Sequence, residues 1–173
     1  MGEVYQSLEN SNGAAGRFIS SHSQFGDKVI ARDLGITSWY APDQVFIDVV
    51  GLTDPFIARK KAELGYNIHN RYLMEQDPAS LEKMKVLFAE MRQYLFEQNA
   101  KWLVGMTYFG DFETAKSAKN AIKKGEFSFF YDYFKNDAFY YHIASDARFF
   151  ERYALAGIWQ YSATTYVTLF QNV

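Results

Sequence analysis

The chain has 173 residues, a formal net charge of −2, no cysteine and an aromatic content of 18%. This length fits one domain, residues 1–173, with a substantial buried core. The charge disfavours nucleic acid as a partner, and the lack of cysteine excludes disulfides, thiolate metal sites and cysteine nucleophiles. Because no apolar run reaches 18 residues and the first residues lack a signal-peptide pattern, we expect a soluble chain.

The N-terminal part predicts a helix followed by short extended segments. Apolar residues recur at helical spacing over about residues 4–22, although Gly13 and Gly16 weaken this helix. The first extended segment is a buried strand that ends in Asp33 and Gly35. We expect extended structure at residues 28–35, 37–44 and 45–52.

Two helices in the middle of the chain have the same start signal. Asp54 and Pro55 fit the N-cap and first helical position of a helix that stops at Gly65, and Asp77 and Pro78 repeat the pair. The second helix carries a core-facing apolar stripe with the members Leu81, Met84, Leu87, Phe88, Met91, Tyr94 and Leu95. The lysine pairs in ARKKAE and NAIKKGE are interpreted as solvated helix faces.

The C-terminal part gives weaker signals. Residues 101–109 predict a strand that joins a parallel sheet through a strand-helix-strand unit. We expect a weak helix at 111–126, a helix from Ser145 to Gly157 and one closing strand at 158–171. The predicted fold is therefore α/β, with a small, mostly parallel central sheet of three or four strands, flanking helices and an aromatic-rich C-terminal part.

Asp33 and Asp48 are the candidate chemical groups, since they end predicted buried strands where ligands gather in α/β sheets. A carboxylate pair there could bind a divalent cation or act as acid and base. The alternative is that each accepts backbone N–H bonds from the following turn. Asp54 is better explained as a helix cap.

Other chemistry has little support in the sequence. His22, His69 and His142 have no metal-ligand spacing, so no metal site is predicted, and no cofactor is expected. The nucleophile elbow, the phosphate-binding loop and the dinucleotide fingerprint are all missing. The aromatic segment 127–141 could present rings to a sugar, a membrane interface or a partner protein, although core packing is its default role.

The stretch RFISSHSQFGDKVIARDLGITSWYAPDQVFIDVVGLTDPFIARK, residues 17–60, resembles a known family. It is similar to the extracytoplasmic, membrane-proximal C-terminal region of bacterial multi-pass glycosyltransferases of the GT-C type, which use polyprenyl-phosphate-linked sugars. The likeness is thin from Lys101 onward. The matching positions are Asp33, Gly35, Trp39, Tyr40, Ile47, Asp48, Gly51, Leu52, Asp54, Pro55 and Ala58, within a segment that also includes Arg59.

The resemblance implies a non-catalytic domain of a periplasmic or other extracytoplasmic membrane enzyme. Its partners would be the transmembrane part of the same protein and a glycan or polyprenyl-linked sugar acceptor. No catalytic residue can be carried over, because the family's catalytic acid lies in the transmembrane part. The rival hypotheses are a stand-alone α/β enzyme that uses Asp33 and Asp48, and a protein-interaction module that uses segment 127–141.

Overall fold

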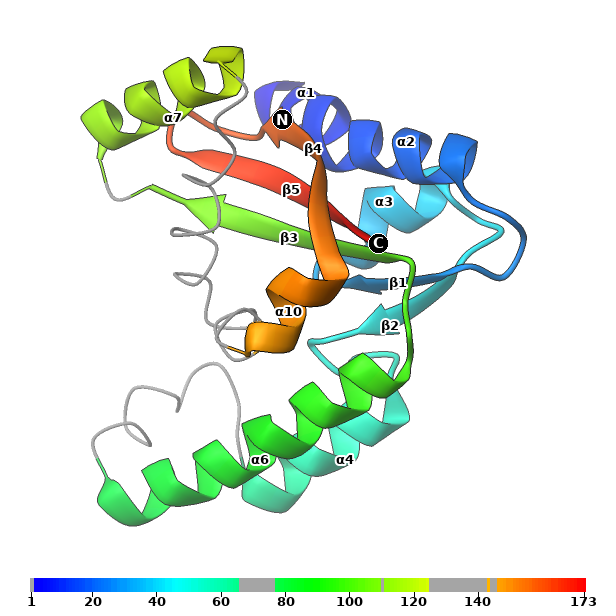
Figure 1. Cartoon of the computed structure of the whole chain (residues 1–173), viewed down its shortest axis with the longest axis vertical. Helices are drawn as coiled ribbons and strands as arrows, with labels where there is room; N and C mark the ends of the chain where they lie inside the picture. Colours follow the sequence, from blue (N-terminus) through cyan, green and yellow to red (C-terminus); the bar gives the residue numbers. More distant parts are fainter. Residues whose placement is uncertain (1, 66–76, 110, 125–142, 144–145) are drawn as a thin grey trace.

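The computed structural model describes residues 2–65, 77–109, 111–124, 143 and 146–173. Its centre is a five-stranded sheet with the strand order β2-β1-β3-β5-β4 (Figure 1). Strand β1 pairs in parallel with β2 and β3, whereas β5 runs antiparallel to β3 and β4. The strands are β1 Lys28–Ala31, β2 Val45–Asp48, β3 Trp102–Tyr108, β4 Tyr153–Gln160 and β5 Thr165–Asn172.

The predicted α/β class is confirmed, but the sheet is mixed and not mostly parallel, and it has more strands than expected. The error lies in the C-terminal part, where one closing strand was predicted over 158–171. The structure has a hairpin there, since β4 and β5 pair antiparallel on either side of a turn at 161–164. Because that turn, YSAT, contains no Gly, Pro, Asn or Asp, its sequence gives no strong turn signal.

Two further segments differ from their predicted structure. The helix expected from Ser145 to Gly157 is the short helix α10, Ala147–Arg152, and the chain continues as strand β4. The first half of the extended piece expected at 37–44 belongs to helix α3, Leu34–Tyr40, and the second half is a turn. In both segments tertiary contacts override weak local propensity, since β4 pairs along its length with β5 and Thr37 of α3 is fully buried.

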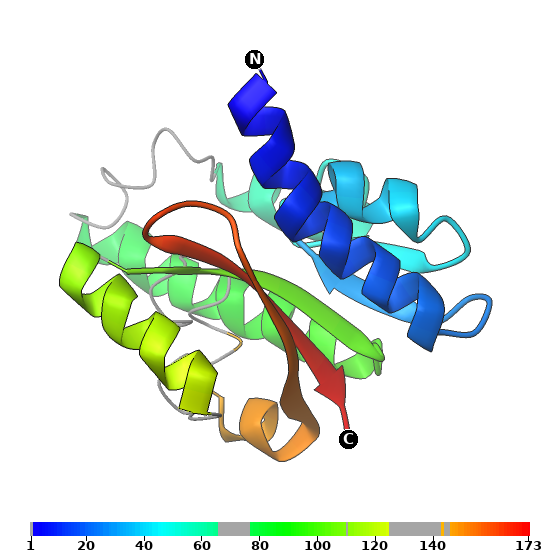
Figure 2. The same ribbon diagram turned by 90° about the horizontal axis from the view of Figure 1, so that it is seen from above.

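Helices cover both faces of the sheet, as Figures 1 and 2 show. The first helix, which has the segments α1 Gly2–Leu8, π-helical Glu9–Gly13 and α2 Ala14–His22, covers one face. Its Ile19 packs in a cluster with Val29 and Trp102 of the sheet. The opposite face packs against α4 Pro55–Leu64, α6 Pro78–Glu97 and α10, and α7 Phe112–Lys124 packs at the far end of β3 and β5.

The helix expected over residues 4–22 is confirmed, and the structure explains its glycines. A β-carbon on Gly16 would lie 2.5 Å from the carbonyl oxygen of Thr37 and 3.0 Å from the β-carbon of Tyr40. Glycine is therefore required where α2 and α3 approach most closely. The π-helical turn lies immediately before this contact and adds a residue to the turn, as π-bulges do.

The two Asp-Pro starts are confirmed as helix caps. The Asp54 carboxylate accepts a hydrogen bond from the Ile57 backbone N–H at 3.0 Å, and Asp77 accepts one from Ser80 at 2.9 Å. Gly65 ends α4 in the left-handed region at φ +68°. The stripe of α6 lies in the core at Met84, Leu87, Phe88, Met91 and Leu95, with Tyr94 packed partly buried beside it.

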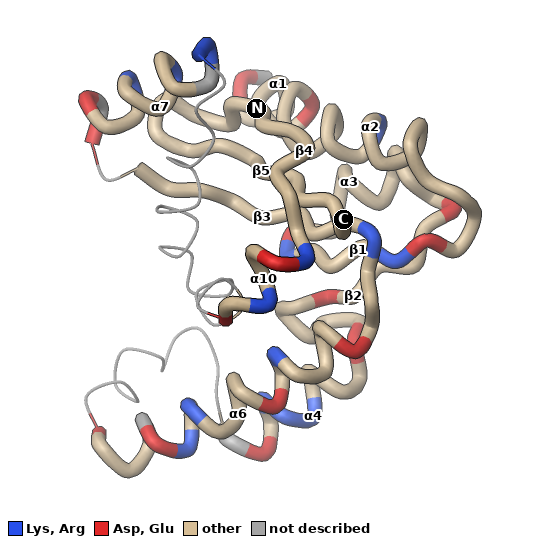
Figure 3. Tube along the Cα trace, viewed as in Figure 1, with Lys and Arg blue, Asp and Glu red and all other residues tan. Residues whose placement is uncertain are grey.

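Figure 3 shows acidic and basic positions interspersed along α4 and α6, as expected from the near-neutral charge. The aromatic segment 127–141 lies outside the described residues, so its three possible roles stay predictions.

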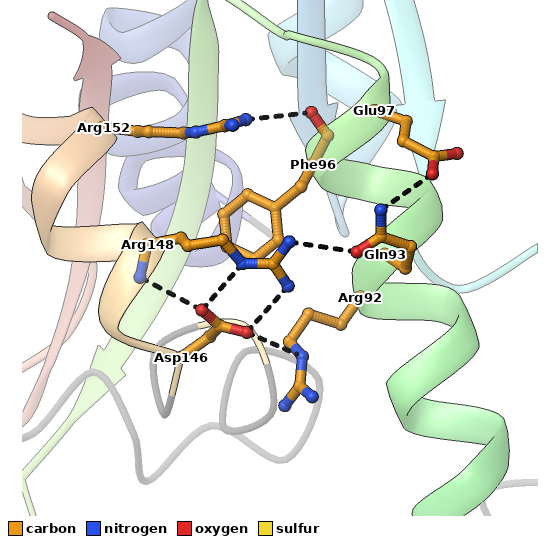
Figure 4. Close-up of polar contacts among 7 residues, drawn as sticks. All are labelled: Arg92, Gln93, Phe96, Glu97, Asp146, Arg148 and Arg152. Atoms are coloured by element: carbon orange, nitrogen blue, oxygen red, sulfur yellow. Dashed lines mark hydrogen bonds and ion pairs between the residues drawn. The ribbon is translucent and has the colours of Figure 1, made fainter.

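Helix α10 is joined to α6 by a polar cluster centred on Asp146 (Figure 4). The Arg148 guanidinium donates to both Asp146 oxygens at 3.0 and 2.9 Å and to Gln93 of α6 at 3.0 Å. Arg92 of α6 forms an ion pair with Asp146 at 3.1 Å. These contacts, among which the Arg148 hydrogen bond has the largest effect, lower the pKa of Asp146 from 3.8 to about 2. The three arginines of this region therefore serve internal contacts, since Arg152 donates to the Phe96 carbonyl.

We expect Asp146→Asn to lower the free energy of unfolding by about 2 kcal/mol at pH 7, because a carboxylate with a depressed pKa stabilises the folded state while it is ionised. That stability is present above pH 3.8 and is lost as the pH falls toward 2. Urea denaturation of both proteins between pH 7 and pH 2 measures the difference. Glu151→Gln, on the exposed side of the same helix, is the matched control and should change stability little. A loss in the Asp146 variant that does not shrink at low pH would contradict this role of the ion pair.

Candidate functional site

A cleft of about 440 Å³ lies at the carboxyl ends of the parallel strands β1 and β2. Three segments line it: the first helix at Leu8 and Asn12, the chain from Arg32 to Ile36, which includes the start of α3, and the end of β2 with its following loop. In open α/β sheets this is the edge at which ligands bind. The cleft contains both predicted carboxylates, Asp33 and Asp48.

Asp48 holds the loop after β2 in place. Its Oδ1 accepts the Val50 backbone N–H at 2.8 Å, and its Oδ2 accepts the N–H groups of Leu52 and Thr53 at 2.7 and 3.0 Å. The Thr53 hydroxyl adds a longer contact to Oδ2 at 3.4 Å. With 1% of its surface exposed, Asp48 serves as the anchor of this turn and is poorly placed to take a proton from a substrate.

Lys61 of α4 fixes the same loop from the other side. Its ammonium group donates to the carbonyl oxygens of Val49 and Val50 at 3.0 and 2.9 Å. Burial lowers the pKa of Lys61 from 10.5 to about 8, the negative charge of Asp48 raises it, and the positive charge of Arg32 lowers it. The prediction that this lysine lies on a solvated face is wrong, because Lys61 is buried one turn after the core residue Ile57.

Asp33 has a different environment from Asp48. It precedes α3 at the N-cap position, but its side chain makes no cap hydrogen bond. It is exposed, lines the cleft together with Gly35, and accepts no side-chain hydrogen bond from the described part of the chain. The expectation that Asp33 anchors its own turn is therefore wrong, and its carboxylate is available to a ligand.

Asn12 is a cleft residue that the sequence did not single out. It lies in the π-helical turn with 5% of its surface exposed, and its backbone carbonyl accepts the Thr37 hydroxyl at 3.3 Å. Its side-chain amide has no hydrogen-bond partner among residues 2–65, 77–109, 111–124, 143 and 146–173. A helical pattern alone gives no signal for such a residue, because the π-turn that places it is not visible in the apolar spacing.

The aromatic motif residues do not line this cleft. Trp39 is 78% exposed on α3. The Tyr40 hydroxyl donates a short hydrogen bond to Glu9, which raises the pKa of Tyr40, and the Arg17 guanidinium lies 4.5 Å from the Tyr40 ring centre. Tyr40 therefore connects α3 to the first helix, whereas the Trp39 ring is left on the surface.

The remaining motif residues shape the loop and the helix after it. Gly51 has φ +81°, and a β-carbon there would lie 2.9 Å from the Ala58 backbone nitrogen, so this turn requires glycine. Besides its cap bond, Asp54 accepts the Tyr94 hydroxyl at 2.8 Å and so ties α4 to α6. Arg59 is exposed on α4 and does not line the cleft.

The structure offers little for metal or histidine chemistry in its described part. No group of three or more His, Cys, Asp or Glu side chains that could hold a metal ion occurs there. His22 is exposed and stacks on Phe18 with ring centres 4.1 Å apart. His69 and His142 lie outside the described residues.

We expect Asp48→Asn to destabilise the protein by about 1–3 kcal/mol, because an amide nitrogen cannot accept the backbone N–H bonds that one carboxylate oxygen accepts. A catalytic Asp48 would instead leave the melting temperature nearly unchanged. Thermal unfolding of the variant measures this, with Asp43→Asn in the exposed turn before β2 as the control. An unshifted melting temperature in the Asp48 variant would exclude the anchoring role.

Lys61→Met should remove a pH-dependent part of the stability. The pKa of Lys61 is lower in the folded protein, so the unfolded chain binds more protons than the folded one between pH 8 and 10.5. For that reason the free energy of unfolding of the wild type rises with pH over this range. Relative to Lys61→Met, the wild type should gain about 2 kcal/mol between pH 7 and 10. Chemical denaturation at a series of pH values tests this.

Lys60→Met is the matched control for that series. The hydrogen bond from Lys60 to Glu90 raises the pKa of Lys60, so its removal should produce no such gain with pH. A constant stability difference between the wild type and Lys61→Met from pH 7 to 10 would show that folding does not lower the pKa of Lys61.

Comparison with known proteins gives a family but no described activity. No curated protein and no solved structure matches the chain. Within the described residues, none of the helices has the combination of length and apolar character that crossing a bilayer requires. One family covers nearly the whole chain, with a match over residues 3–170. The chain belongs to this family, which is described as "Domain of unknown function (DUF8728)".

Proposed function

We propose that this chain is a non-catalytic, extracytoplasmic domain of a bacterial membrane glycosyltransferase, and that its cleft recognises or positions the acceptor glycan. The observation that carries the proposal is that three separated parts of the motif meet at one cleft. Asp33, Gly35 and Asp48 line it together with Leu52, although up to 19 positions separate them in the sequence. The glycosyltransferase assignment itself rests on the resemblance of residues 17–60.

The state of the two carboxylates favours binding over catalysis. Acid-base catalysis by a pair requires two groups that can each exchange a proton with the substrate. Asp48 is buried and accepts hydrogen bonds from its own loop on both oxygens, which leaves Asp33 as the one carboxylate of the cleft with a free acceptor. The stand-alone enzyme hypothesis is weaker for that reason.

The cleft also has the composition of a site for an uncharged or weakly charged ligand. Leu8, Leu34, Ile36 and Leu52 supply apolar surface, and a few polar groups lie among them. Small-molecule sites combine apolar walls with a small number of placed polar groups. A sugar has this dual character, since its C–H faces are apolar and its hydroxyl groups both donate and accept hydrogen bonds.

Binding to an array of oligosaccharides from bacterial cell envelopes tests the proposal, with a parallel assay for transfer or hydrolysis of polyprenyl-phosphate-linked sugars. We expect the chain to bind at least one glycan and to form no product. Thr53→Trp places a large ring on an exposed cleft residue and should abolish binding, whereas the matched Asp43→Trp, before β2, should retain it. Product formation by the chain alone, or binding to no glycan on the array, would refute the proposed function.

A further inference from the structure

The cleft contains two polar side chains whose hydrogen-bonding capacity is unused within the described part of the chain. Asn12 offers a carbonyl oxygen and an NH₂ group, and Asp33 offers carboxylate oxygens. Asn12 as a residue is only 5% exposed, and it lines the open space of the cleft. A ligand or water in the cleft can complete the hydrogen bonds of its amide.

The charges at the cleft disfavour a phosphate or another strong anion. Asp33 and Asp48 are two carboxylates on its lining, and Arg32 is the one cation there among the described residues. The Lys61 ammonium, which interacts with Asp48, is not part of the lining. Arg32 also has an interaction within the protein, so its charge is not without a partner. An anion would have to approach the free carboxylate of Asp33, and like charges at close range repel.

A neutral polyol fits the same groups. A sugar hydroxyl can donate to the Asp33 carboxylate, and a neighbouring hydroxyl can accept from the Asn12 NH₂ group while donating to its carbonyl oxygen. The apolar residues Leu34 and Ile36 can contact the C–H face of the ring. The loop that Asp48 and Lys61 hold rigid supplies the remaining wall.

We infer that the cleft selects a neutral sugar ring over its phosphorylated form, with Asn12 and Asp33 as the residues that determine this specificity. The inference rests on the proposed glycan-binding function and adds the class of ligand and the residues that recognise it. The sugar of an acceptor glycan would then lie in this cleft, and any lipid-linked phosphate would lie outside the cleft.

Nuclear magnetic resonance titration of the ¹⁵N-labelled chain tests the inference. The probes are the methyl glycosides of glucose, galactose and mannose, each paired with its 6-phosphate, at up to about 50 mM so that millimolar dissociation constants are detected. We expect at least one neutral glycoside to shift the amide signals of the cleft segments. Its phosphate should bind at least about tenfold more weakly, because the charge repels Asp33.

Two variants assign the recognition to the named side chains. Asn12→Leu and Asp33→Asn should each weaken binding of the neutral glycoside about tenfold. Asn12→Leu leaves a sugar hydroxyl without its partner, and Asp33→Asn replaces a charged acceptor with a weaker neutral one. Asp43→Asn removes the same charge at the opposite end of β2 and should leave the affinity unchanged. Asp33 is exposed and its side chain makes no hydrogen bond to cap α3, so Asp33→Asn reports on binding even if Asn12→Leu unfolds.

The outcomes separate this inference from the proposed function. Tighter binding of a 6-phosphate, or neutral binding that neither variant weakens, overturns the inference and leaves glycan recognition standing. Binding to array glycans, when none of the six probes shifts a signal, likewise overturns the inference and leaves glycan recognition standing. If neither the array nor the titration shows binding, the inference and the proposed function are both overturned. Preference for a neutral glycoside that depends on Asn12 and Asp33 supports both.

Discussion

The hydrogen bonds between the Asp48 carboxylate and its own loop are the interaction on which the cleft depends. They hold the chain from Val50 to Thr53 at the carboxyl end of the sheet. Lys61 of α4 donates hydrogen bonds to the carbonyl groups of Val49 and Val50, and Gly51 adopts the left-handed conformation that the turn requires. A buried carboxylate and a buried ammonium thus define one wall of the site without either serving as a reactive group.

The opposite wall depends on close packing between helices. Gly16 lets α2 approach the backbone of α3, and Tyr40 and Arg17 join these helices through Glu9. The π-helical turn next to this contact brings Asn12 to the cleft. The cleft is therefore formed between these two walls, and its polar groups Asn12 and Asp33 come from the side of the first helix and α3.

Much of the fold could be predicted because its signals are local. The caps at Asp54 and Asp77, the stop at Gly65 and the apolar stripe of α6 follow from chemistry within one helix. The β4–β5 hairpin and α3 were missed, since their stability comes from strand pairing and from the burial of Thr37. The residues of these segments have weak turn and helix propensities, so the local sequence carried no signal of the strand pairing or of the burial.

The candidate site could be predicted only in part for the same reason. Strand ends pointed to Asp33 and Asp48, but their different roles arise from the direction of backbone N–H groups in the loop after β2. Lys61 looked like a surface residue in a lysine pair, and Asn12 gave no signal. Both acquire their importance from burial, which depends on how distant helices pack.

A crystal structure of the chain soaked with a neutral glycan that it binds tests the role of the cleft most directly. We expect sugar density in the cleft, with hydroxyl groups within hydrogen-bond distance of Asn12 and Asp33 and with the Asp48 loop unchanged. Binding of the sugar on another surface would contradict this role of the cleft. A sugar oxygen in contact with the Asp48 carboxylate, with the loop after β2 opened, would also contradict it.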